Sequence, residues 1–245
     1  MTTPVNRNVA AKVDGCLSRL GRWLLAPTCL LCAEPGAGGR DLCQACTEAL
    51  PWNRSACARC GLPLPAPAAA CGACLQQPPP FASTTAAFVY DFPVDRLLPR
   101  LKFHADLAAG AVLADVMLPA FVFAERPEAL VPVPLHGSRL RQRGYDQALE
   151  LAKPLARALA LPLRQDLLRR VRATEAQSEL DARHRRDNLR GAFVAAAIRQ
   201  PPKHVALFDD VMTTGTTLVE ATSALKKAGV LRVDVWVLAR VPARA

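Results

Sequence analysis

Two adjacent carboxylates, Asp209 and Asp210, stand where an apolar run, residues 205–208, gives way to a loop of four threonines and one glycine. The run is typical of a buried parallel strand, and residues 218–229 predict a helix that ends at a glycine. Backbone N–H groups and the helix dipole bind phosphate at such a loop, and threonine hydroxyls add donors. The carboxylates repel a phosphate, but they suit the hydroxyls of a sugar that carries it. The pattern therefore predicts a ribose-phosphate site at the carboxyl edge of a parallel sheet. A strand–turn–helix with a solvated acidic turn is the plain structural alternative. The predicted ligand-binding residues are Asp209, Asp210, Val211, Met212, Thr213, Thr214, Gly215, Thr216 and Thr217.

A second group of candidate ligands follows the apolar residues 129–133. Arg139, Arg141 and Arg143 fall at alternate positions before Gly144 and the start of a predicted helix. Arginine forks bind phosphate oxygens with two parallel hydrogen bonds. We expect a loop here, at the carboxyl end of a strand, to face the Asp209–Asp210 loop; a solvated basic loop is the alternative.

The third stretch, residues 172–190, is polar, long and almost without apolar side chains. It predicts a loop with a helical turn. Such loops close as lids that exclude water over a reactive centre, although a plain surface loop is the better explanation of this stretch taken alone.

Eight of the nine cysteines form four Cys-x-x-Cys pairs. Each pair places two thiolates on one side of a turn, and two such turns complete the tetrahedral shell of structural zinc. The segment around them is rich in Pro, Gly and Ala, so metal must hold it together. Two full shells predict two structural zinc ions, and redox-active pairs are the weaker alternative. The ligands are Cys29, Cys32, Cys43, Cys46, Cys57, Cys60, Cys71 and Cys74.

The spacing leaves two pairings open. Sequential pairing joins the first pair with the second and the third with the fourth. Cross-braced pairing joins the first with the third and the second with the fourth. Cys16 lies outside any pair, and we interpret it as a free thiol.

The chain has 245 residues and a net charge of +10, which favours anionic partners. Residues 1–27 predict a short basic amphipathic helix, with Val13, Leu17, Leu20 and Leu24 on one face. That helix could contact a membrane surface or a partner, or pack on the body of the protein itself. The start of the chain lacks the pattern of a secretory signal, and we expect a cytoplasmic protein.

Strands and helices alternate from Phe81 onward, which predicts an α/β fold: a mostly parallel sheet with helices on both faces. The expected strands are 86–90, 129–133, 166–172, 191–197, 204–208 and 232–239; the expected helices are 94–103, 105–124 and 145–159. The proline-rich residues 76–80 favour a boundary between domains. We expect a helical leader at 1–27, a double zinc-ribbon module at 28–77 and the sheet domain at 78–245.

The segment DDVMTTGTT resembles the phosphoribosyl-pyrophosphate (PRPP) motif of type I phosphoribosyltransferases. With the cysteine pairs, it makes the chain similar to the ComF family, which joins an N-terminal zinc ribbon to a phosphoribosyltransferase domain. Further matches to that family's patterns are the Leu-Lys-Phe signature at Leu101, Lys102 and Phe103, then Arg143, Gly144, Tyr145, Gln147, Thr174, Gln177, Leu180, Arg185, Asn188, Ala192 and Phe193. The chain departs from the family at Asp146, where asparagine is usual.

The resemblance implies a role for each stretch. Asp209 and Asp210 would bind the ribose hydroxyls and act in catalysis, residues 213–217 would hold the 5-phosphate, and the arginine loop with Gly144 and Lys102 would hold pyrophosphate. Mg²⁺ would bridge pyrophosphate and ribose oxygens, and pyrophosphate would be displaced at the anomeric carbon. The flexible loop would contribute Thr174, Gln177, Arg185 and Asn188.

Two functions remain open at this point. The first is an enzyme that transfers a phosphoribosyl group to an acceptor that no stretch specifies, in DNA uptake (competence) or nucleotide metabolism. The second is a non-catalytic protein that senses PRPP or a nucleotide and handles single-stranded DNA together with competence-transport proteins.

Overall fold

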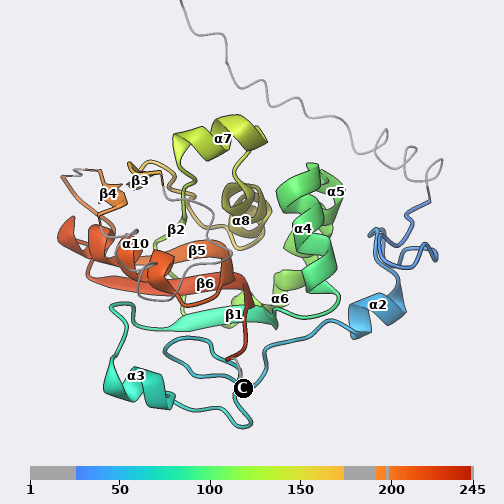
Figure 1. Ribbon diagram of the computed structural model, residues 1–245, viewed down its shortest axis with the longest axis horizontal. Coiled ribbons are helices and arrows are strands. Elements are labelled where there is room, and N and C mark those ends of the chain that lie inside the picture. Colours follow the sequence, from blue (N-terminus) through green and yellow to red (C-terminus); the bar gives the residue numbers. More distant parts are fainter. Residues whose placement is uncertain (1–25, 174–190, 197–198, 244–245) are drawn as a thin grey trace, which may run out of the picture.

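A four-stranded parallel sheet forms the centre of the computed structural model (Figure 1), which describes residues 26–173, 191–196 and 199–243. The strand order is β1-β6-β5-β2, and every neighbouring pair runs parallel. A separate antiparallel hairpin joins β3 to β4. The strands are β1 Thr84–Val89, β2 Ala129–Pro132, β3 Leu168–Arg170, β4 Phe193–Ala195, β5 His204–Met212 and β6 Arg232–Arg240. The sheet thus confirms the predicted α/β class.

Helices cover both faces of the sheet, as predicted. On one face α4, α5 and α8 enclose a core around Phe208 and Trp236. On the other face α10 and the β3–β4 hairpin enclose a second core around Val205 and Val235. The helices are α2 Gln44–Glu48, α3 Gly72–Gln76, α4 Val94–His104, α5 Leu107–Met117, α6 Pro119–Val122, α7 Gly137–Arg143, α8 Gln147–Ala158 and α10 Thr216–Lys227.

The cysteine-rich module lies along the β1 edge of the sheet. Residues 51–53, between its two halves, pair with this strand: the Val89 N–H donates to the Pro51 carbonyl at 2.7 Å, and the Asn53 N–H donates to the Ala87 carbonyl at 3.0 Å. The Trp52 ring packs against Phe88, with centroids 4.8 Å apart. The module therefore covers an edge strand that would otherwise offer unpaired backbone groups to another chain.

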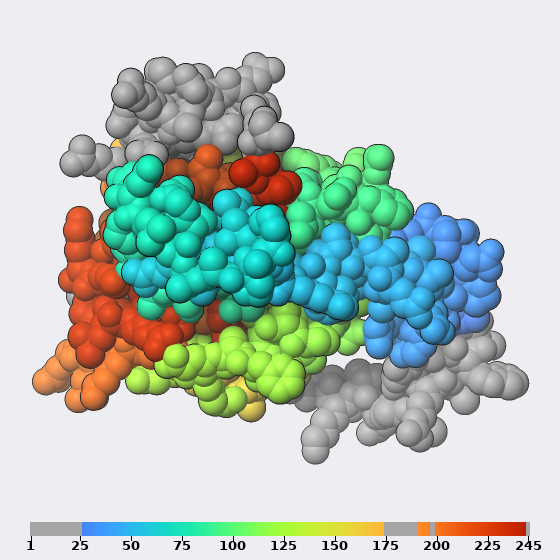
Figure 2. Space-filling view, turned by 90° about the horizontal axis from the view of Figure 1, so that it is seen from below, coloured from blue at the N-terminus to red at the C-terminus, as the bar shows by residue number. Residues whose placement is uncertain are grey.

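The two halves of the module sit on opposite faces of the sheet. Cys29 and Cys43 of the first half belong to the core beneath α4 and α5, whereas Cys60 of the second half packs against the core beneath α10. Figure 2, viewed from below, shows the module spread across one face of the molecule against both the middle and the C-terminal parts of the chain.

One predicted helix is wrong in its extent. Residues 105–124 form two helices, because Asp106 caps the start of α5 and Pro119 begins α6. Within the described residues, no helix is both long enough and apolar enough to span a bilayer. Nearly all of the predicted leader, with Cys16, and all four predicted lid residues lie outside the described part of the chain. The boundary expected at 77–78 stays a prediction.

Candidate functional site

The acid pair lies within the last part of β5 and not beyond its end. The strand continues to Met212, because Asp209 still pairs with Val237 of β6 and Met212 with Arg240. The prediction that the strand ends before the carboxylates is therefore wrong by four residues. As a consequence, the backbone of both acids is held by strand pairing and not by a loop.

Asp210 is buried, with 5% of its surface exposed, and it has a cationic partner. The Lys102 Nζ atom lies 2.9 Å from Asp210 Oδ2. Lys102 comes from the last turn of α4, whose position is fixed further by the Tyr145 hydroxyl, which donates to the Leu101 carbonyl. The Leu-Lys-Phe and Arg-Gly-Tyr segments thus meet beside the acid pair.

Asp209 carries an unusual electrostatic load. Burial, and then the neighbouring Asp210 charge, raise the pKa of Asp209 well above its ordinary value, although its own hydrogen bond from the Asp210 N–H acts in the other direction. The guanidinium of Arg170, on β3, is close enough to interact with the Asp209 charge. A carboxylate held at such a cost is typical of a ligand-binding position.

The threonine loop is shorter than the sequence predicts, because Thr216 and Thr217 already form the start of α10. Gly215 has a φ of 79° and precedes α10, and a Cβ atom there would lie 2.6 Å from the Met212 Cε atom. The hydroxyls of Thr214 and Thr216 are 2.9 Å apart, while Thr213 and Thr214 are exposed. Exposed hydroxyls and N–H groups at the start of a twelve-residue helix can cradle a phosphate.

The arginine segment is a helix, so the predicted loop is wrong. Residues from Gly137 to Arg143 form α7, which ends at Gly144 with a φ of 80°. Arg139 and Arg143 are one turn apart and lie on one side, whereas Arg141 points elsewhere and is exposed. Burial, and then the Arg143 charge, lower the pKa of Arg139, which places these two guanidinium groups near each other.

Asp146 has a structural task. Its Oδ1 atom accepts from the Leu149 N–H at 3.1 Å and so caps α8, while Oδ2 accepts from the Leu135 N–H at 2.7 Å. Burial, opposed by these hydrogen bonds, raises the pKa of Asp146. The Asp146 carboxylate, at the position where the sequence departs from the family that it resembles, therefore faces backbone donors.

Two arginines of the site were not predicted from the sequence. Arg170 lies in a strand too short to carry a pattern, and its nearness to Asp209 and Arg139 arises only from the fold. Arg240 is the last residue of β6, and it donates to the carbonyls of Met212 and Thr213 at 3.2 and 2.6 Å. A charge at the end of an apolar strand was the available signal.

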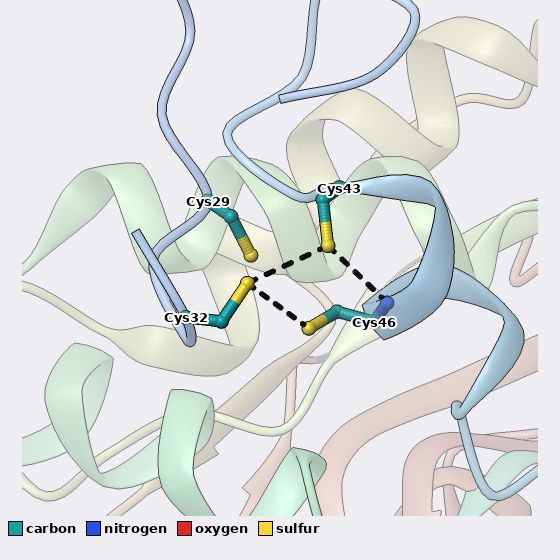
Figure 3. Close-up of side chains that lie close together, drawn as sticks. All are labelled: Cys29, Cys32, Cys43 and Cys46. Atoms are coloured by element: carbon teal, nitrogen blue, oxygen red, sulfur yellow. Dashed lines mark hydrogen bonds between the residues drawn. The ribbon is translucent and has the colours of Figure 1, made fainter. Parts of the chain in front are cut away.

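The eight paired cysteines gather into two groups of four in sequential pairing, so the cross-braced alternative is excluded. Figure 3 shows the first group, in which the side chains of Cys29, Cys32, Cys43 and Cys46 lie together. In the first group, Cys32 Sγ lies 3.6 Å from Cys43 Sγ and 3.7 Å from Cys46 Sγ. In the second, Cys60 and Cys71 sulfurs are 3.7 Å apart. Tetrahedral coordination at a Zn–S distance of about 2.3 Å requires sulfurs about 3.8 Å apart, so both groups fit zinc.

Two thiols are prepared for metal binding. Burial acts to raise the pKa of Cys29 and Cys57, but backbone hydrogen bonds outweigh it and lower the pKa to about 6 and about 7. Thiolates are the form that binds zinc. Each group holds four ligands, which leaves no open position for a substrate, so both sites are structural.

Comparison with known proteins agrees with this architecture. Residues 20–75 match the model of the double zinc ribbon domain, and residues 146–245 match the model of the phosphoribosyl transferase domain. Competence protein F of Haemophilus influenzae is 38% identical over 174 residues, which cover 68% of this chain and 76% of that protein. The chain belongs to the Competence protein F family.

Other relatives in the family carry a different name. DNA utilization protein YhgH of Salmonella typhi is 36% identical over 174 residues, covering 68% of this chain and 75% of that protein. Among solved structures, orotate phosphoribosyltransferase from Aeropyrum pernix is 24% identical with a TM-score of 0.35, covering 61% of this chain and 65% of that one. The ComF resemblance seen in the sequence is confirmed.

Proposed function

We propose that this ComF-family protein binds PRPP with Mg²⁺ and transfers its phosphoribosyl group to a nucleophilic acceptor. The observation that carries the proposal is the order of groups along one stretch of backbone. Strand β5 carries two carboxylates near its end, and after Met212 a short threonine loop bent at Gly215 leads into α10. Sugar-binding oxygens and a phosphate cradle are thereby a few residues apart, as a ribose 5-phosphate requires.

The basic side chains suit the other end of such a ligand. Arg139 and Arg143 share one side of α7, and Arg170 lies near Arg139. These three guanidinium groups, of which Arg170 lies close enough to interact with Asp209, would neutralise a pyrophosphate and stabilise its charge as it leaves. Lys102 neutralises Asp210 while the ribose hydroxyls are absent.

Mg²⁺ would arrive with PRPP, take few direct protein ligands and neutralise part of the charge of the pyrophosphate. Asp209 is the protein group best placed to accept a hydrogen bond from a ribose hydroxyl, since Asp210 faces Lys102. In the reaction, the bond from the anomeric carbon to pyrophosphate breaks with its electron pair on the leaving oxygen, and the acceptor forms the new bond. The negative charge of the acid pair would stabilise the developing positive charge on the sugar.

A screen for pyrophosphate release across nucleobases and amines tests the transfer step. Release with one acceptor, lost in Asp209→Asn, supports an enzyme. PRPP binding without release for any acceptor contradicts transfer and favours a sensor.

A DNA-handling protein is the second candidate. The net charge of +10 and the names of the relatives, Competence protein F and DNA utilization protein, favour it. Residues 134–190 alone hold 13 Lys or Arg against 7 Asp or Glu. In this proposal the fold senses PRPP or a nucleotide in the reducing cytoplasm, where thiols remain available to zinc. Partners would be single-stranded DNA and transport proteins, with the leader at a membrane surface.

A salt titration of single-stranded DNA binding decides this second candidate. Affinity that falls steeply with salt and changes when PRPP is added supports it. Absent binding at low salt contradicts it.

A further inference from the structure

The buried Arg240 joins the second cysteine group to the predicted phosphate loop. Only 8% of its surface is exposed, and its guanidinium donates to four backbone carbonyls. Nε donates to Cys60 at 3.1 Å, and Nη1 donates to Met212, Thr213 and Val241. A guanidinium taken out of water recovers its hydration through such acceptors, so this geometry is costly to abandon.

The residues at the two ends of this link have defined roles. Cys60 is a ligand of the second zinc site, so a donor on its carbonyl fixes the backbone that carries the thiolate. Met212 ends β5, and Thr213 begins the loop that leads to Gly215. One side chain therefore holds a zinc-ligand residue and the first turn of the phosphate loop in register.

Charge strengthens the link. A zinc ion with four thiolates carries a net charge of about −2, and Arg240 is close enough to interact with the thiols of Cys60, Cys71 and Cys74. A zinc-loaded site therefore attracts the guanidinium in a medium where water screens little. Loss of zinc removes that anionic cluster together with the order of the Cys60 turn.

Side-chain packing leaves open space beside this link. A cavity of about 430 Å³ separates the second cysteine group from the loop, and Thr214, Thr216 and Arg240 line its walls. Since this space is not filled by side chains, the hydrogen bonds of Arg240 are a principal connection across it.

The first zinc site has a comparable link to a different element. Arg100 Nη1 donates to the Leu30 carbonyl at 2.6 Å, and Arg100 belongs to α4. Leu30 lies between the ligands Cys29 and Cys32. A backbone carbonyl in each cysteine group thus accepts from an arginine of the sheet domain, and of these two arginines Arg240 is the one that reaches the phosphate loop.

We propose that Arg240 is a positioning residue through which zinc in the second site orders residues 212–217, and that zinc in the first site has no such effect. The ligand part rests on the proposed function: zinc in the second site raises affinity for PRPP, and PRPP raises the affinity of that site for zinc by the same factor in return.

Hydrogen exchange on the zinc-loaded full chain tests the coupling without PRPP. Arg240→Gln removes the guanidinium and keeps every cysteine, and Arg100→Gln is the matched control. We expect amide exchange in residues 212–217 to rise about tenfold in Arg240→Gln and to stay at the wild-type rate in Arg100→Gln. Zinc transfer to a chromogenic chelator should accelerate for one of the two ions in Arg240→Gln. Unchanged loop exchange, or an equal rise in both variants, overturns the proposal.

Two cysteine variants separate this proposal from the proposed function. Cys74→Ser empties the second site and Cys46→Ser the first, and metal analysis checks that one zinc remains in each. PRPP affinity should fall about tenfold in the former and hold in the latter. If wild type fails to bind PRPP, the proposed function fails, while the exchange data still decide the coupling. If a cysteine variant does not fold, Arg240→Lys serves instead: it keeps the charge without the fork, so affinity and loop exchange should lie between those of wild type and Arg240→Gln. Wild-type behaviour of Arg240→Lys and Arg240→Gln alike refutes the link.

Discussion

Lys102 and Asp210 form an ion pair of 2.9 Å that joins the end of α4 to the carboxyl end of β5. The Asp210 side chain is 7% exposed and the Lys102 side chain 21%, so water screens the pair only in part. The pair neutralises one of two adjacent carboxylates in a protein without ligand. A ligand that binds Asp210 must therefore either displace the Lys102 ammonium group or bind beside it.

Replacing Lys102 with methionine should destabilise the protein by about 2 kcal/mol, because it leaves a buried carboxylate without its partner. Urea unfolding at neutral pH measures the loss. Lys153→Met is the matched control, since its pair with Glu150 is largely exposed and should contribute less than about 0.5 kcal/mol. Adding Asp210→Asn to Lys102→Met should restore part of the stability. Equal stability of both single variants and wild type would refute this role.

Asp209→Asn should stabilise the protein without ligand at neutral pH. The pKa of Asp209 is raised in the folded state by burial and by Asp210, so its contribution is full below the ordinary aspartate value and is lost as the pH rises through the raised value. The wild type should therefore lose stability relative to Asp209→Asn across that window, with the gap constant above it.

Urea unfolding at a series of pH values and constant ionic strength measures this gap. Asp166→Asn is a control of opposite sign, because the hydrogen bond from Arg164 lowers the pKa of Asp166. Parallel profiles for wild type and Asp209→Asn would contradict the electrostatic account.

Gly215→Ala should destabilise the protein by more than the cost of placing alanine in a left-handed backbone conformation. Gly215 and Gly144 have nearly equal φ angles, 79° and 80°, but an added Cβ meets Met212 at 2.6 Å at the former and nothing within 4 Å at the latter. We expect about 1–2 kcal/mol for Gly144→Ala, and a larger loss with impaired PRPP binding for Gly215→Ala. Equal thermal stabilities of the two variants would show that Met212 moves aside freely.

The three arginines of α7 should not be equivalent. Arg139→Ala and Arg143→Ala should each weaken PRPP binding about tenfold or more, because each removes a charged hydrogen-bond donor on one side of the helix. Arg141→Ala should bind nearly as wild type. Titration of all three variants decides the matter, and a uniform loss would favour the extended loop that the sequence predicts over the helix.

The sequence predicts the fold best where an apolar run is long enough to mark a buried strand. The apolar residues of β5 and β6 predict buried parallel strands, and the structure pairs them in register from His204 to Met212. The break within residues 105–124 was hidden, since a run of apolar and small residues does not display the Asp106 cap and the Pro119 start as a boundary.

The sequence predicts the site only where its functional residues are close together along the chain. The segment from Asp209 to Thr217 contains its own acids, hydroxyls and glycine, so a single stretch predicts it. By contrast, Arg170 and Arg240 reach the site from other strands, and their contacts depend on the packing of the hairpin and on the order of the sheet. The sequence did not predict the α7 helix, because arginines at alternate positions are typical of an extended chain.

The cysteine spacing predicted the ligands but not their pairing. Sequential and cross-braced arrangements use the same eight thiols, and only the fold separates them. Each half packs on its own face of the sheet beside β1, which brings Cys29 to Cys43 and Cys57 to Cys71.

Calorimetric titration of the zinc-loaded protein with PRPP and Mg²⁺ tests the central claim most directly. The account predicts one site per chain in wild type and a loss of affinity of about tenfold or more in Asp209→Asn, whose stability shows that it is folded. Asp166→Asn, on the exposed surface, should bind as wild type. Wild type that gives no binding heat across temperatures, or Asp209→Asn that binds as tightly as wild type, would contradict the assignment of this site.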